Sequence, residues 1–228
     1  VLIVILFQKL KPAYYETSAI VTSGISAYER IPSDQDEDIL NQRSAINLIN
    51  NLQFDVKKED YKSLANKLNL SEEQSSQIKF IEAEQLLRQD KDEKFHNTPK
   101  FQINLLVRDY NIISDIEIGL IYYFDSNEYV IKYKNQYNAD NRLKIEAIDE
   151  EIAEIKELRR QAKSPIDMST NRIFSSKEKT EVENQVIALE DFKSIIKTQD
   201  LIDPLDFVKY FTRTEVAERQ ILVWETTV

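Results

Sequence analysis

The stretch from Arg142 to Pro165 constrains the fold more than any other part of this chain. It reads RLKIEAIDEEIAEIKELRRQAKSP, with no glycine and with its only proline at the last position. Its apolar residues recur at gaps of three and four, which places them along one side of a helix: Ile145, Ile148, Ile152, Ile155 and Leu158. A seam this narrow predicts packing against one partner helix rather than burial in a core.

The helix is predicted to begin well before this stretch. Ser114 has the residue type of an N-cap, Glu117 follows three residues later, and Ile113 and Ile118 have the spacing of a hydrophobic staple. Pro165 ends the helix, because the residue before a proline disfavours helical dihedrals. We therefore expect one continuous helix over residues 114–163, roughly 75 Å long at 1.5 Å per residue.

A partner helix follows in the sequence. Ser175 and Glu178 form an S-x-x-E capping box. Beyond it, apolar residues again fall on one helical face: Val182, Val186, Leu189, Phe192 and Ile196. The two helices predict a projecting, coiled-coil-like helical hairpin over residues 138–199.

The N-terminal part of the long helix is aromatic. Five tyrosines occur there at helical spacing: Tyr122, Tyr123, Tyr129, Tyr133 and Tyr137. Tyrosines serve both as buried packing residues and as interface residues. We interpret this broad face as core or subunit interface, with stacking on sugars as the alternative.

The rest of the chain predicts a small sheet with helices. Alternating side chains indicate strands at 13–24 and, most clearly, at 101–109, and further strands are predicted at 78–83 and about 205–211. Apolar spacing predicts helices around 39–52 and 61–68, and Ser71 with Gln74 forms a capping box. Residues 88–100 read as a polar loop. The fold class is therefore α+β, with a small mixed β-sheet base domain, flanking helices and the projecting hairpin.

These elements divide the chain into three parts. Residues 1–12, which begin VLIVILF, are expected to be the end of a transmembrane helix or a juxtamembrane segment, since no charge interrupts the apolar run. A short buried strand is the alternative. The base domain comprises residues 13–137 with 200–228, and the hairpin comprises residues 138–199.

Composition excludes several kinds of site. A net charge of −10 argues against nucleic-acid binding, which needs a basic face. Two glycines cannot build a phosphate-binding loop, and the absence of cysteine removes thiolate ligands and nucleophiles. The single histidine, His96, reads as a solvated loop side chain. We expect no catalytic, cofactor-binding or metal-binding residues, no cofactor, and no enzymatic activity.

Three segments resemble the periplasmic domain of the Wzz-type polysaccharide chain-length determinants, or polysaccharide co-polymerases. They are KPAYYETSAIV at 11–21, FQINLLVRDYNIISDIEIGLIYYFDSNEYV at 101–130 and DPLDFVKYFTRTEV at 203–216. Each matches in pattern and position rather than by a signature. The order of the predicted elements matches as well.

The resemblance implies a function and a location. Members of this family are anchored in the inner membrane by flanking segments, with this domain in the periplasm. They form homo-oligomers beside the polymerase and the growing polysaccharide, and they regulate the chain length of O-antigen of lipopolysaccharide, capsule or exopolysaccharide. The family's Pro/Gly-rich segment near the second transmembrane helix does not occur in this sequence.

Two other hypotheses remain open at the sequence level. One is a periplasmic helical-hairpin adaptor or interaction scaffold unrelated to polysaccharide synthesis. The other is a hydrolase that uses paired carboxylates, of which the chain has many, including the SDQDED run at 33–38, Asp203 and Asp206. We interpret these carboxylates as solvated surface charge, because no other feature of a catalytic site accompanies them.

Overall fold

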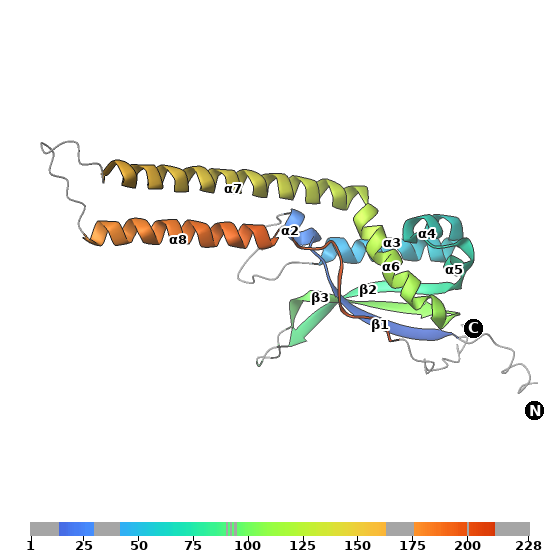
Figure 1. Cartoon of the computed structure of the whole chain (residues 1–228). Helices are drawn as coiled ribbons and strands as arrows, with labels where there is room; N and C mark the ends of the chain where they lie inside the picture. Colours follow the sequence, from blue (N-terminus) through green and yellow to red (C-terminus); the bar gives the residue numbers. More distant parts are fainter. Residues whose placement is uncertain are drawn as a thin grey trace, which may run out of the picture. The chain divides into compact units, whose positions relative to one another are not determined.

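Four strands form one sheet in the computed structural model, which describes residues 14–29, 42–89, 91, 93, 95–162, 176–199 and 201–212. The strands are β1 (Tyr15–Thr22), β2 (Ile78–Gln89), β3 (Phe95–Val107) and β4 (Asp206–Lys209), in the order β2-β3-β1-β4. With the helices below, they confirm the α+β class (Figure 1).

The sheet is antiparallel at every pairing within the described residues, where the sequence analysis expected a mixed one. The reason lies in the strand order. The helical crossover makes β1 and β2 run in the same direction, but β3 lies between them and pairs with both.

Alternation along the strands was predicted correctly. Phe101, Ile103, Leu105 and Val107 of β3 are all fully buried. On β1 the buried side chains are Thr17, Ala19 and Val21, which alternate along the strand. These two strands form the centre of the sheet, and their inward side chains make the core of the base domain.

The prediction of a polar loop at 88–100 is wrong. Most of it belongs to β2 and β3, and His96 lies in β3 opposite Arg88. The strands continue there despite their polar sequence because backbone pairing and amide hydrogen bonds hold them. The Gln85 side chain donates to the carbonyls of Thr98 (2.6 Å) and Lys100 (2.9 Å) at a register shift between Gln85 and Leu87.

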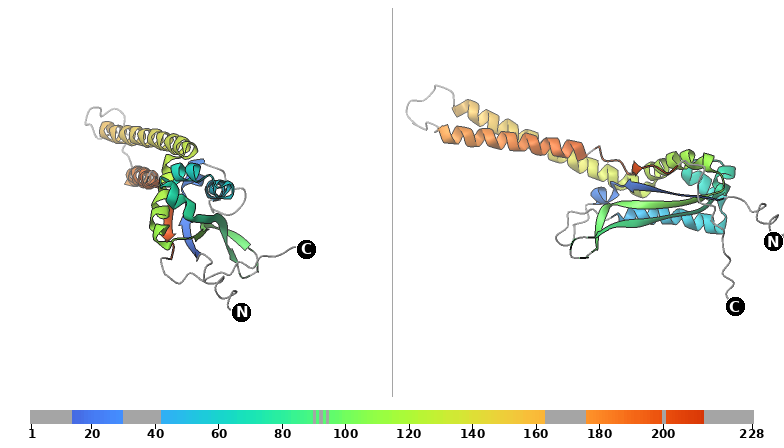
Figure 2. Two further views of the ribbon diagram at one scale, coloured as in Figure 1. Left: turned by 90° about the vertical axis from the view of Figure 1, so that its right-hand side faces the viewer. Right: turned by 90° about the horizontal axis from the view of Figure 1, so that it is seen from below.

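Helices cover one face of the sheet (Figures 1 and 2). They include α2 (Ile25–Glu29), α3 (Arg43–Lys58), α4 (Tyr61–Leu68) and α5 (Glu72–Gln77). The predicted apolar faces are confirmed where described, with Ile49 and Leu52 of α3 and Leu64 and Leu68 of α4 fully buried. The predicted capping box between Ser71 and Gln74 is also present, with both of its hydrogen bonds.

The predicted continuous helix over 114–163 is two helices, α6 (Ile113–Ser126) and α7 (Glu128–Ala162). Asn127 between them has an extended backbone with ψ of 123°. Its side-chain oxygen accepts hydrogen bonds from the backbone amides of Tyr129 (3.0 Å) and Val130 (3.4 Å), as an N-cap does. The 35 residues of α7 span roughly 52 Å.

The predicted start of the helix is also wrong. A 3-10 turn, η1 (Tyr110–Ile112), precedes α6, and the Asp109 carboxylate caps it by accepting from the Asn111 amide at 2.9 Å. Ser114 lies inside α6, and Ile118 is 66% exposed, so it forms no staple with Ile113.

The chain divides into two compact units. One falls within Val1–Tyr133 and Asp203–Val228, which we call the base, and the other is Lys134–Ile202. The second unit contains most of α7 and all of α8 (Ser176–Gln199). Residues 1–12, the capping residue Ser175 and the C-terminal 213–228 lie outside the described residues. Within the described part, no helix combines the length and apolarity needed to cross a membrane.

Candidate interaction surfaces

The isoleucine seam joins α7 to α8 as an antiparallel hairpin. Ile148, Ile152 and Ile196 form its buried core, and Ile145, Val186 and Leu189 pack around them. This confirms the predicted hairpin packing of the two helices. Two predicted seam residues are outside it, because Leu158 is 65% exposed and Phe192 is 52% exposed.

At this turn of α8, Lys193 lies in the seam instead of the predicted Phe192. Gaps of three and four fit either residue at this turn of α8, so spacing alone did not decide between them. The Lys193 ammonium contacts the Asp149 carboxylate of α7, with 2.6 Å to Oδ2. The aliphatic stem of a lysine can cover apolar surface while its charge reaches outward, so it fits a seam edge.

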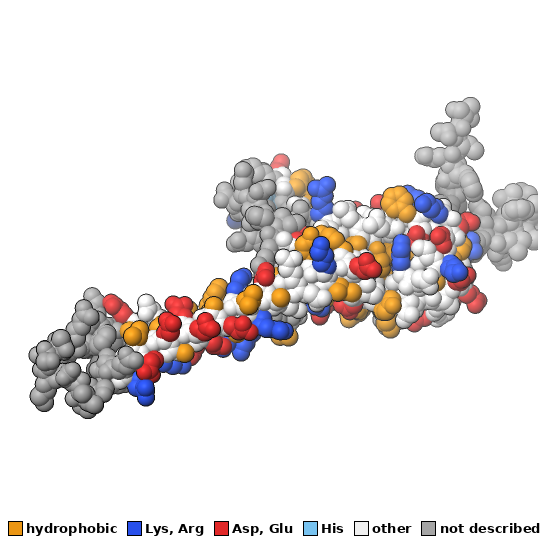
Figure 3. All heavy atoms as spheres, turned by 90° about the horizontal axis from the view of Figure 1, so that it is seen from above, with side chains coloured by type: hydrophobic (Ala, Val, Ile, Leu, Met, Phe, Trp, Pro, Cys, Tyr) orange, Lys and Arg blue, Asp and Glu red, His pale blue; other side chains and the backbone are white. Residues whose placement is uncertain are grey.

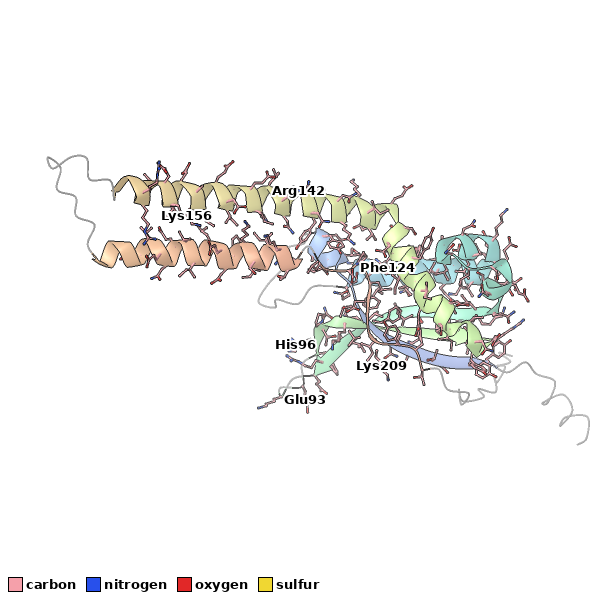
Figure 4. All side chains as sticks on the ribbon, viewed as in Figure 1. Glu93, His96, Phe124, Arg142, Lys156 and Lys209 are labelled. Carbon is pink, nitrogen blue, oxygen red and sulfur yellow. The ribbon has the colours of Figure 1, made fainter. Side chains whose placement is uncertain are left out.

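Ion pairs along the hairpin fix its register. Besides Lys193 with Asp149, Lys156 lies 3.6 Å from Glu190, and Arg159 pairs with Glu183. Figure 4 labels Lys156 on α7, and Figure 3 shows acidic and basic side chains interspersed along these helices. Exposed pairs each contribute only about 0–1 kcal/mol. Their effect here is to favour one antiparallel alignment over a shifted one.

The tyrosines do not form one continuous helical face, because Asn127 separates α6 from α7. Tyr123 is buried, and its hydroxyl donates to the Leu48 carbonyl at 3.4 Å. Burial, aided by the nearby negative charge of Asp55, raises the pKa of Tyr123. Tyr137 is buried in the hairpin unit, where its hydroxyl donates to Gln199 at 3.3 Å. Both therefore have the packing role that the sequence analysis favoured.

Tyr129 lies in the first turn of α7, in the part of this helix that belongs to the base. Its hydroxyl donates to the Glu29 carboxylate of α2, and its ring packs against Tyr133 at 4.8 Å between centroids. The hydrogen bond to Glu29 raises the pKa of Tyr129 to about 12, with smaller contributions from burial and from the charge of Glu29. The neutral phenol is the form that this contact stabilises.

The segment directly after β4 is hydrogen-bonded to a buried carboxylate. Glu117 of α6 is 3% exposed and accepts a hydrogen bond from the Phe211 amide at 3.0 Å. The Thr17 hydroxyl of β1 accepts from the Thr212 amide at 2.9 Å. Sequence reasoning treated Glu117 only as part of a helix cap, and nothing in its spacing indicated burial.

Apolar side chains remain exposed on both units. On α8 they are Ile187, Phe192 and Ile195. On α6 Ile118, Ile121 and Tyr122 follow helical spacing and are 66%, 37% and 43% exposed. On the β2–β3 hairpin Leu87 and Phe95 are 55% and 66% exposed. These surfaces are the candidate contact sites for partners.

Within the described ranges, no three His, Cys, Asp or Glu side chains are grouped so that they could hold a metal ion. Asp203 and Asp206 are exposed, and the SDQDED run lies outside the described residues. A hollow along α7 is lined by Ala153, Glu154, Glu157 and Leu158, which supply two carboxylates and no basic side chain. The absence of enzymatic activity stays a prediction.

The described residues thus define an α+β domain with a two-helix hairpin inserted in the chain between β3 and β4 of one sheet. No family model and no curated protein matches the sequence. Among solved structures, one similar chain is described as a full-length bacterial polysaccharide co-polymerase. It is 11% identical, with a TM-score of 0.29, and the match covers 93% of this chain and 80% of that one.

Proposed function

We propose that this protein regulates the chain length of a cell-surface polysaccharide, acting as a membrane-anchored, oligomeric scaffold in the periplasm beside the polymerase. One observation carries the proposal. The chain leaves a small sheet after β3, forms a long antiparallel hairpin, and returns to the same sheet as β4. This is the element order of the chain-length determinants that the segments at 11–21, 101–130 and 203–216 resemble.

The proposed role is non-enzymatic. Regulation of length by a scaffold requires surfaces that hold a polymerase or a growing chain, and it requires no reacting groups on the scaffold itself. The exposed apolar residues of α6, α8 and the β2–β3 hairpin are candidates for such surfaces.

Deletion of the gene in the organism that encodes this protein tests the proposal. The expected result is surface polysaccharide in undiminished total amount but without its preferred length, seen as a broad ladder on a gel. Re-expression should restore the preferred length. An unchanged length distribution would contradict the proposal.

The exposed apolar face of α8 also fits a second candidate, an adaptor that docks another protein. Its prediction differs, because deletion would then leave polysaccharide length unchanged while a partner is lost from the membrane fraction. Comparing both readouts in one deletion strain separates the two functions.

A further inference from the structure

The chain crosses between the base and the second unit twice, at Tyr133–Lys134 and at Ile202–Asp203. On the base side, residues close to both crossings are hydrogen-bonded to one short segment. This segment comprises residues 23–29, directly after β1 and through α2, and we call it the clamp segment. Two points of the chain that are far apart in sequence therefore share one support.

At the first crossing, the contact comes from the start of α7. The Tyr129 hydroxyl donates to the carboxylate of Glu29, the last residue of α2. α7 is a single helix from Glu128 to Ala162, so no break in the helix separates this contact from the crossing. The contact therefore fixes the first turn of the helix that enters the second unit.

At the second crossing, the contacts come from two successive backbone carbonyls. The Asp203 carbonyl accepts from the Gly24 amide at 3.1 Å, and the Pro204 carbonyl accepts from the Ser23 hydroxyl at 2.5 Å. α8 ends shortly before them, at Gln199. The chain is therefore held in place almost as soon as it leaves the hairpin.

The clamp segment is itself firmly held within the base. The Gln42 side chain accepts from the Ser23 amide at 3.0 Å and donates to the Ser23 carbonyl at 3.3 Å, and Gln42 is 2% exposed. Ile25 and Tyr28 of α2 are buried. Because buried, hydrogen-bonded groups are costly to separate, a displacement of this segment would act on both crossings together.

We propose that the clamp segment holds the hairpin closed at the end where Tyr137 of α7 meets Gln199 of α8. At their other ends, α7 and α8 are joined by the chain between Ala162 and Ser176. Fixing the two crossings at a set separation joins the helices at this end as well, which lowers the entropy cost of bringing them together. Loss of either clamp contact therefore favours local opening of the seam at this end.

This inference goes beyond the proposed function, because it concerns what keeps the hairpin closed and holds for any activity of the protein. A deletion strain with unchanged polysaccharide length would overturn the proposed function and leave the clamp segment untouched.

Hydrogen exchange of backbone amides in the whole chain tests the clamp. Glu29→Ala removes only the contact at the first crossing, and both Glu29 and Tyr129 are at least partly exposed, so the variant should fold. We expect severalfold faster exchange in the last turns of α8, which Glu29 does not need to touch. Amides of β3 and amides near Glu183, at the other end of α8, should exchange as in the native protein.

Two matched variants show whether the contact itself is responsible. Glu29→Gln keeps an oxygen that can accept from the Tyr129 hydroxyl, so exchange in the last turns of α8 should return close to the native rate. Asp125→Ala removes an exposed carboxylate from α6 and should change nothing there.

Ser23→Ala releases the second crossing instead. Because either loss opens the same end of the hairpin, Ser23→Ala with Glu29→Ala should accelerate exchange in the last turns of α8 hardly more than one of them alone. Multiplied effects would show two independent contacts and overturn the clamp. Native exchange there in Glu29→Ala would overturn it too, and this variant decides the matter even where Ser23→Ala fails to fold.

Discussion

Gly119 of α6 lies against the C-terminal end of α4. A Cβ atom added there would lie 2.5 Å from the Leu68 backbone oxygen, which cannot move without shifting the end of α4. Gly119→Ala would gain roughly 1 kcal/mol of helix propensity but lose about 1–3 kcal/mol by overpacking. We expect a net loss of stability in urea unfolding. Asp125→Ala, at an exposed site on the same helix, should change it little, and a stabilised Gly119→Ala variant would contradict the close approach.

Tyr129 gives a prediction about pH. Its pKa is raised from 10.0 to about 12, so the folded state holds its proton more tightly than the unfolded chain. The stability that this hydrogen bond supplies is present below about pH 10 and is lost as the pH rises through 12.

The measurement is a spectroscopic titration of tyrosinate in the native protein and in Tyr129→Phe. The ionisation that disappears in the variant should have its midpoint near 12. Glu29→Gln keeps a side-chain oxygen that can accept from the Tyr129 hydroxyl, but it removes the negative charge. This variant should therefore lower the midpoint. A midpoint near 10 in the native protein would show that the contact with Glu29 does not form in solution.

Among the helices, the apolar spacing of α8 allows two sets of residues in the seam, and the structure of the hairpin shows which set is used. The sequence analysis placed Phe192 in the seam, whereas the structure leaves it 52% exposed and buries Ile196 at 3%. Ile196→Ala should cost about 2–5 kcal/mol, as deletions of buried side chains do. Phe192→Ala should cost under about 1 kcal/mol, as exposed substitutions do. Thermal melts of the pair decide between them, and the reverse order of stabilities would restore the seam expected from the sequence.

How far the sequence could predict these elements depended on the kind of signal. Two-residue alternation identified β1 and β3, and the Ser71–Gln74 box identified the start of α5, because each is encoded within a few residues. The break at Asn127 was missed since its flanks, Tyr123 and Val130, continue the helical apolar spacing. An asparagine followed by Glu128 is itself a capping signal, and it could have located the break.

Other features depended on partners far away in the chain. The polar residues at 95–100 form a strand only because β2 pairs with them. Glu117 is buried because the amide of Phe211, 94 residues later, donates to it. The exposure of Leu158 reflects where α8 meets α7, which spacing within α7 cannot specify.

For the whole molecule, we expect the proposed regulation of chain length to depend on an intact hairpin. Ile148 lies in the core of the seam at 7% exposure, whereas Leu158, three turns along the same helix, is 65% exposed. Ile148→Asp buries a carboxylate without a partner and should separate α7 from α8, while Leu158→Asp places the same charge in water.

The most direct test is the length distribution of surface polysaccharide in a deletion strain that expresses either variant at the native level. We expect Leu158→Asp to restore the preferred length. Ile148→Asp, although present in the membrane in equal amount, should yield the broad distribution of the deletion. The contrary result is full restoration of the preferred length by an Ile148→Asp protein whose hairpin is shown to be open by loss of helical circular dichroism. That result would contradict a requirement for the intact hairpin.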